Sequence, residues 1–190
     1  MTLGLNFDAI LSAARAGAEW AWTRLYDEFS PLVLGYLRAR GAAEPEDLTG
    51  EVFLQIVRDI ETFSGDERSF RSWLLSVAHH RMIDAARYRA RRPVEPVPHE
   101  TLAGHAPAGD AETEAIEALA SERVSAVIAT LTPDQQDVLL LRILGDLTVE
   151  EVARVLAKRP GAVKQLQRRG LAQVKKKLEN EGIFLGGGRN

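Results

Sequence analysis

The chain of 190 residues contains no cysteine. This absence excludes disulfide bridges, thiol catalysis and zinc or iron–sulfur sites that cysteine would hold. No run of 18 apolar residues occurs, so the sequence predicts no membrane-spanning helix and no membrane insertion. The residues after Met1 lack the charged, apolar and small-residue succession of a signal peptide, and we expect a cytoplasmic protein.

Strand patterns and catalytic motifs are also missing. No segment alternates apolar and polar residues as a half-buried strand does. There is no serine elbow and no Walker loop, and the glycines at 186–188 lack the lysine that a phosphate loop requires. His80 and Asp84 lie four residues apart, but two candidate ligands do not make a metal site. We therefore expect no enzyme, no cofactor and no bound metal.

The formal net charge of −3 conceals four blocks of opposite sign. Residues 44–67 carry eight acids against one arginine, and residues 68–92 carry seven arginines against one aspartate. Residues 93–122 carry seven acids and no lysine or arginine, whereas residues 158–178 carry eight lysines and arginines and no acid. Such segregation predicts separate surfaces for separate partners.

Helical periodicity runs through the first half of the chain. Apolar residues recur every three or four positions from Phe7 to Ala14, over residues 20–40 and again over 48–60. Ser64, Gly65 and Asp66 predict a turn, after which another helix runs into an arginine-rich end at residues 87–92.

The segment 147–178 predicts a helix-turn-helix. Thr148 and Glu151 have the spacing of a capping box, and Pro160 suits the first position of a following helix. A second helix of this charge can enter the major groove, where it neutralises phosphates and reads base edges. A basic run by itself is more often a solvated helix end. The capped helix and short turn favour DNA binding here. The candidate DNA contacts are Arg159, Lys164, Gln165, Arg168, Arg169 and Lys175.

These patterns predict an all-α fold with two small helical domains joined by a flexible acidic linker. The prolines, glycines and acids of residues 93–111 indicate the linker. We expect the domains to span residues 1–92 and 112–180, and residues 181–190 to form a disordered tail.

Four motifs together resemble the extracytoplasmic-function sigma factors, the minimal two-domain group of the bacterial sigma-70 family. The first is Asp47-Leu-Thr-Gly-Glu-Val-Phe-Leu54, similar to the signature of region 2.2. Next come Phe63-Ser-Gly-Asp66 with Phe70-Arg-Ser-Trp-Leu74, and Ala78-His-His-Arg-Met-Ile-Asp84. The fourth, from Leu131 to Leu178, is similar to region 4. The resemblance covers nearly the whole chain.

The resemblance implies a factor that binds core RNA polymerase and directs initiation by recognising the −10 and −35 promoter elements. Region 2.2 would dock on the β′ clamp helices, region 4 on the β flap and the −35 element, and the loop after residue 62 would hold a base flipped from the −10 strand. An anti-sigma factor is an expected partner in this family. The polymerase-binding candidates are Asp47, Glu51, Val52 and Gln55. The −10 candidates are Phe63, Ser64, Gly65, Asp66, Arg71, His80, Arg81 and Arg87. The −35 candidates are the six residues of the helix-turn-helix named above.

Three residues depart from the family pattern. Gly50 stands where glutamine is common, His80 where asparagine is frequent, and Gly170 where alanine is usual, which predicts a looser end of the recognition helix. We expect the side chains of Phe70, Trp73 and Leu74 to pack in the core rather than to stack on a nucleobase.

Two other classes remain open from the residues alone. A response regulator would need an α/β receiver, against which the helical first half argues. A helical adaptor that binds only proteins would show no promoter-specific transcription.

Overall fold

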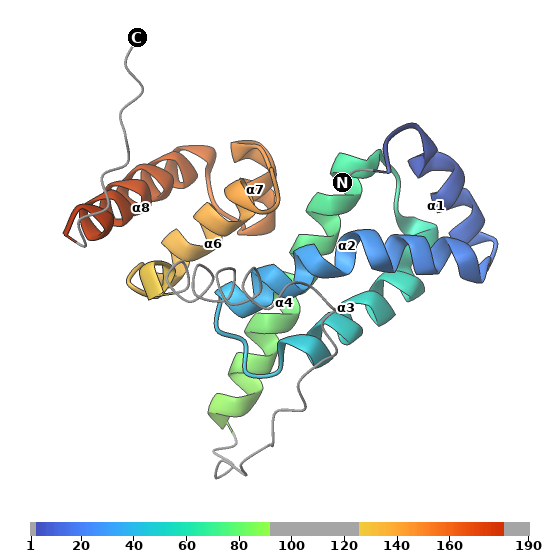
Figure 1. The fold of residues 1–190 in the computed structure, drawn as a ribbon, viewed down its shortest axis with the longest axis horizontal. Coiled ribbons are helices and arrows are strands. Elements are labelled where there is room, and N and C mark those ends of the chain that lie inside the picture. Colours follow the sequence, from blue (N-terminus) through green and yellow to red (C-terminus); the bar gives the residue numbers. More distant parts are fainter. Residues whose placement is uncertain (1–2, 92–125, 181–190) are drawn as a thin grey trace, which may run out of the picture.

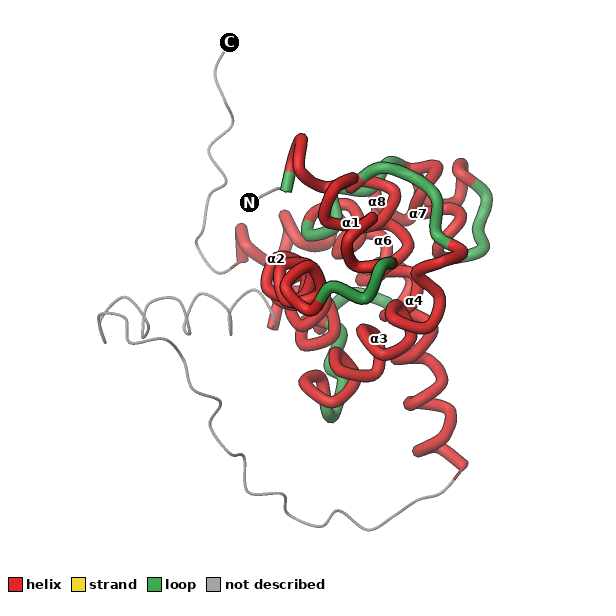
Figure 2. Tube along the Cα trace, turned by 90° about the vertical axis from the view of Figure 1, so that its right-hand side faces the viewer, coloured by secondary structure: helices red, strands yellow, loops and turns green. Residues whose placement is uncertain are grey.

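The computed structural model describes residues 3–91 and 126–180, and every regular element within them is helical (Figures 1 and 2). The expected all-α fold is confirmed. The linker 93–111 and the tail 181–190 lie outside the described residues. The elements are η1 (Gly4–Asn6), α1 (Phe7–Arg15), α2 (Glu19–Ala39), α3 (Pro45–Asp59), η2 (Ile60–Thr62), α4 (Glu67–Arg91), α6 (Pro133–Ile143), α7 (Val149–Val155) and α8 (Pro160–Asn180).

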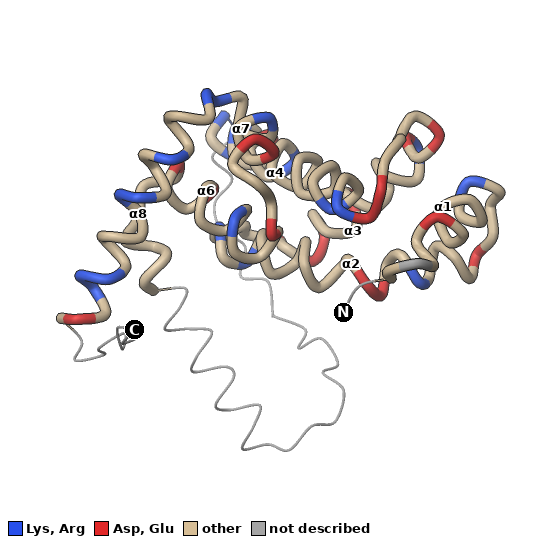
Figure 3. The backbone as a smooth tube through the Cα atoms, turned by 90° about the horizontal axis from the view of Figure 1, so that it is seen from above, with Lys and Arg blue, Asp and Glu red and all other residues tan. Residues whose placement is uncertain are grey.

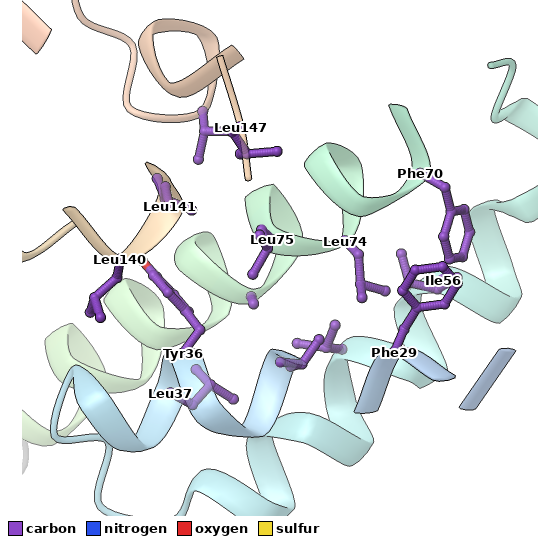
Figure 4. Packing of buried hydrophobic residues seen from close by; sticks show 14 of the residues in the cluster. Phe29, Tyr36, Leu37, Ile56, Phe70, Leu74, Leu75, Leu140, Leu141 and Leu147 are labelled. Carbon is purple, nitrogen blue, oxygen red and sulfur yellow. The ribbon is translucent and has the colours of Figure 1, made fainter. Parts of the chain in front are cut away.

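Helices α1 to α4 form an N-terminal bundle in which α2 contacts the other three. The bundle centres on Phe70, which is fully buried and lies with its ring centroid 5.1 Å from that of Phe29 and 5.5 Å from that of Phe7. Burying a phenylalanine side chain stabilises a fold by about 1.5–3 kcal/mol. Leu74 is also fully buried, as the sequence predicts (Figure 4).

Helices α6, α7 and α8 form a C-terminal unit. Helix α6 starts at a capping box between Thr132 and Gln135, with Pro133 in the first turn. Gly170 is buried, and a Cβ added there would lie 3.0 Å from Leu139 Cδ1, so this glycine lets α8 approach α6 closely. Gly170 thus permits tight packing of α8 on α6, a role that the sequence did not indicate, and the looser helix end stays a prediction.

The bundle and the C-terminal unit share one continuous hydrophobic core. Leu74 and Leu75 of α4, Tyr36 of α2, Leu141 of α6 and Leu147 point into neighbouring parts of this core in Figure 4. Helix α4 contacts α7, and α2 contacts α6. The two halves of the chain therefore pack directly against one another.

Candidate nucleic-acid and polymerase interface

Helix α8 carries a row of exposed basic and polar side chains, and lysines and arginines recur along its length in Figure 3. Val163 and Gly170 face the core and turn Lys164 and Arg168 outward. Arg159, Gln165 and Arg169 line a shallow groove of about 350 Å³ at the start of the helix. Lys175 is exposed further along and pairs with Glu179 at 3.7 Å.

Four of the six −35 candidates thus occupy two adjacent rows of α8. Arg159 lies in the connection just before the helix and joins the row of Gln165 and Arg169. Lys164 and Arg168, four residues apart, form the other row. Both rows are exposed, so the helix can present point charges to phosphates and planar groups to base edges.

The orientation of α8 depends on the capped helix before it. Thr148 Oγ1 accepts a bond from Glu151 N at 3.2 Å, and Thr148 N donates to Glu151 Oε2 at 2.5 Å. The expected capping box is present. Lys158 in the connection donates to Asp134 of α6 at 2.8 Å, which ties the turn to the rest of the unit.

We expect Thr148→Ala to lower the free energy of unfolding by about 1 kcal/mol, because the cap accepts an otherwise unpaired backbone N–H. Thermal unfolding of the full chain measures this loss. Thr23→Ala is the matched control, since its hydroxyl donates only to the exposed Glu19 carbonyl of the same helix. Equal unfolding temperatures for the two variants would contradict a structural role for the capping box.

The pKa of Glu151 is also lowered. Burial raises it, but the bonds from Thr148 and the nearby Arg68 outweigh that effect. Because the folded pKa lies below the ordinary value, the cap contributes its stability above that value and loses it as the pH falls through the folded pKa.

The turn before α4 is built by a cap and a glycine. Asp66 Oδ1 accepts from Ser69 N at 2.8 Å, and hydrogen bonding to the Ser69 side chain and then to its backbone N–H lowers the pKa of the carboxyl. Gly65 has φ +150, and an added Cβ would lie 2.6 Å from Ser69 Cβ. Asp66 and Gly65 therefore hold the shape of the loop rather than line its pocket, a role that the D-x-x-S spacing could have indicated.

A pocket of about 430 Å³, called the loop pocket below, lies between this turn, α4 and α7, which contributes Glu151, Arg154 and Val155 to its lining. Phe63 stacks on Trp73 with ring centroids 5.0 Å apart and planes inclined by 15°. Trp73 is only half-buried, so it both packs on the core and lines the pocket, where the sequence predicts core alone. The bundle residues around the loop pocket are Thr62, Phe63, Ser64, Ser69, Ser72, Trp73 and Ser76.

The remaining −10 candidates are spread around α4. Exposed His80 continues the pocket face, with Nδ1 2.7 Å from the Ser76 carbonyl oxygen. Arg81 donates to Gln55 Oε1 at 2.5 Å, and exposed Arg87 pairs with Asp84 at 3.7 Å. Arg71 pairs with Glu67 and lines a different pocket, so the structure does not bring it to the loop pocket.

Helix α3 presents a mixed polar and apolar surface. Asp47 and Glu51 are exposed, and Gln55 is half-buried, bonded to both Arg81 and Asp59. Val52, expected on this surface, is 0% exposed and belongs to the core, because it lies in the apolar stripe of α3. Leu54, 58% exposed, and Val57 are the apolar residues that do reach the surface, and sequence reasoning missed both. Leu54 lies off the apolar stripe, which was the available signal, whereas Val57 was expected within the stripe and is exposed instead.

The described part of the chain contains no cluster of three metal-ligating side chains. Among the same residues, no helix is both long and apolar enough to cross a membrane.

Comparison with known proteins finds matches to two family models. The sequence matches Sigma-70 region 2 over residues 25–92 and Sigma-70, region 4 over residues 121–174. It is 34% identical over 177 residues to the ECF RNA polymerase sigma factor BldN of Streptomyces coelicolor, covering 90% of this chain and 66% of that protein. It is 30% identical over 190 residues to SigD of Mycobacterium tuberculosis, covering 95% and 88% of the respective chains.

A solved structure of similar fold is CnrH in complex with the cytosolic domain of CnrY, with a TM-score of 0.65 and 20% identity over 92% of this chain and 97% of that one. RpoE from Bartonella quintana, solved with NepR, gives a TM-score of 0.61 and 16% identity over 83% and 96%. Both likenesses concern the fold. On the sequence matches, the chain belongs to the extracytoplasmic-function sigma factors of the sigma-70 family, which direct RNA polymerase to promoters.

Proposed function

We propose that the chain contacts a promoter at two separate elements while it is bound to core RNA polymerase. Helix α8 reads the −35 element, and the loop pocket with α4 reads and opens the −10 element. The observation that carries this proposal is the pair of separate polar surfaces: basic rows on α8, and a pocket with a stacked aromatic pair on α4. The chain thus acts by binding rather than by catalysis, and it acts in the cytoplasm.

Each of the two promoter contacts is made by one domain. The domains span residues 1–92 and 112–180, and residues 93–111 form the linker between them. For the −35 element, Lys164 and Arg168 supply one row of contacts, and Arg159, Gln165 and Arg169 the other. Lys175 adds a phosphate contact further along.

For the −10 element, an extruded base enters the loop pocket beside Phe63 and Ser64. Stacking on an aromatic side chain offsets part of the cost of unstacking the base. Gly65 and Asp66 shape the loop, and His80 extends the contact along α4. Arg81 and Arg87 meet the backbone phosphates.

The surface of α3 docks on the β′ clamp helices of the polymerase, while the C-terminal unit meets the β flap. Exposed Asp47 and Glu51 provide the charges, with Gln55 at the edge. The exposed side chains of Leu54 and Val57 add apolar area to this docking surface. An anti-sigma factor is a further candidate partner, since RpoE from Bartonella quintana was solved in complex with the anti-sigma factor NepR.

Charge reversal on α3 tests the docking surface. We expect Asp47→Lys with Glu51→Lys to weaken binding to core polymerase about tenfold or more, because like charges across an interface are costly. Affinity capture of the full chain by core polymerase, titrated at constant salt, measures the change. Glu19→Lys is the control, an exposed acid on α2. Equal affinities for the α3 variant and the control would show that α3 is not the docking surface.

A further inference from the structure

Helix α1 lies beside the connection that runs from α3 through η2 to α4 and forms one side of the loop pocket (Figure 1). The helix is outside the Sigma-70 region 2 match, which begins at residue 25. Its buried residue Phe7 lies with its ring centroid 5.5 Å from that of Phe70, and Phe70 lies 5.4 Å from Phe63 of the connection. Helix α1 therefore packs behind the residues that shape the pocket.

The last residue of α1, Arg15, reaches this connection with its guanidinium. Arg15 Nε donates to the Ile60 carbonyl at 3.3 Å, and Nη2 donates to the Phe63 carbonyl. The Phe63 amide also donates to the Ile60 carbonyl at 3.3 Å, so one guanidinium holds both ends of a closed backbone turn. A basic side chain at a helix C-terminus can bond the carbonyls of its own last turn, whereas Arg15 bonds those of another segment.

The N-terminal segment also contacts the far end of the loop. The Gly4 amide donates to Glu67 Oε2 at 2.8 Å, and Glu67 is the first residue of α4. The loop of residues 63–66 is thus attached on both sides to one short stretch of chain, by Arg15 at its start and by Gly4 just beyond its end. The separation of the two loop ends therefore depends on this stretch.

The bond from Arg15 acts on the part of the loop that faces the pocket. The Phe63 carbonyl belongs to the peptide unit that joins Phe63 to Ser64, and both residues line the loop pocket. Fixing this peptide unit fixes the directions in which the two side chains leave the backbone, including the stacking of Phe63 on Trp73. The next residue, Gly65, is conformationally permissive, so the loop has freedom that an external bond must remove.

We propose that Arg15 is a positioning residue for the −10 site: it holds the loop so that Phe63 and Ser64 meet an extruded base in one orientation. This inference rests on the proposed function of the loop pocket. Arg15 acts through the loop backbone rather than by contact with DNA. Because a loop held in advance loses less entropy when the base enters, the effect is on discrimination of the −10 element rather than on general affinity for DNA.

Hydrogen exchange in the free full chain tests whether Arg15 holds the loop. Arg15→Ala removes both bonds, and we expect the amides of residues 60–69 to exchange about fivefold or more faster, because the loop opens locally. The amides of α8 are the internal reference. Arg24→Ala is the matched control, because it removes an exposed arginine from α2. Unchanged exchange in the loop, or equal acceleration in α8, would overturn the positioning role.

The second arm measures how the assembled holoenzyme discriminates between two single-stranded oligonucleotides. One carries the −10 element of a promoter that the holoenzyme transcribes, and the other carries the same bases in scrambled order. A single strand needs no melting, so the ratio of the two affinities reports recognition alone. We expect Arg15→Ala to lower this ratio about tenfold, with unchanged affinity for the scrambled strand and for core polymerase. Arg15→Lys keeps the charge but lacks the planar fork that bridges two carbonyls, so we expect it to stay close to Arg15→Ala.

Other roles for Arg15 give different results. A phosphate contact would make Arg15→Ala weaken both strands equally and lower the salt dependence by about one unit, and Arg15→Lys would restore binding. That result would overturn the proposal, as would faster exchange in the loop with an unchanged ratio. Absence of discrimination by the unmodified holoenzyme would instead contradict the proposed −10 site, while the exchange data would still decide whether Arg15 holds the loop.

Discussion

A chain with alanine at both Lys164 and Arg168 is expected to lose most promoter-specific transcription and to keep its affinity for core polymerase. Both side chains are exposed on the outward row of α8, and neither supports the core. Loss of a base contact costs about 1–3 kcal/mol, and loss of a phosphate contact reduces the salt dependence by about one unit. The pair should therefore lower initiation by about tenfold to a few hundredfold at fixed salt.

Run-off transcription on a promoter with an intact −35 element measures this loss, and capture on core polymerase measures the retained binding. Arg24→Ala with Arg38→Ala is the matched control, because it removes two exposed positive charges from α2 instead. If the α8 variant lost polymerase binding together with transcription, these residues would belong to the polymerase interface and the −35 assignment would be wrong.

Gly65→Ala is expected to impair promoter opening while leaving recognition of the −35 element intact. The backbone φ of +150 is unfavourable for alanine, and the new Cβ would meet Ser69 Cβ at 2.6 Å. Strain of this kind costs about 1–3 kcal/mol, so the loop must shift to accommodate the methyl group. A shift of the loop changes the pocket wall beside Phe63. Each 1.4 kcal/mol lost in the opening step lowers its rate about tenfold.

Fluorescence of a base analogue placed in the −10 non-template strand reports opening in the assembled holoenzyme. Gly41→Ala is the control, since that glycine has φ +70 but no heavy atom within 4 Å of an added Cβ. The control should lose some stability and keep its opening rate. Equal opening rates for Gly65→Ala and the unmodified chain would show that the loop is not part of the −10 site.

Local signals in the sequence predicted much of the fold. The capping box at Thr148, Pro160 at the start of α8 and the helical periodicity of the first half each depend on neighbours within one or two turns. The exposed basic rows of α8 follow from the same periodicity, because Val163 and Gly170 fix which face is buried. These elements were predictable because their cause is local.

Val52 and Trp73 show where the sequence-based expectations differ from the structure. Val52 lies in the apolar stripe of α3 and is buried, although the family motif around it had suggested a surface role. Trp73 lies beside the buried face of α4 and is large enough to reach both core and solvent, which a division into buried and exposed positions does not describe.

The contact between the two halves could not be predicted from the sequence. Asp137 appears there as one acid in a short helix, and nothing marks Tyr36 or Arg40, about 100 positions away, as its partners. A buried charge needs partners, but their identity depends on how the helices pack. The contribution of α7 to the lining of the loop pocket depends on the same packing.

Promoter-directed transcription in a defined system tests the central claim most directly. Purified full chain is mixed with bacterial core RNA polymerase and a genomic DNA library, and the 5′ ends of the transcripts are mapped. We predict discrete start sites, absent with core polymerase alone, that share sequence elements near positions −35 and −10. Transcript ends that are the same with and without the chain would contradict its assignment as a promoter-recognition subunit.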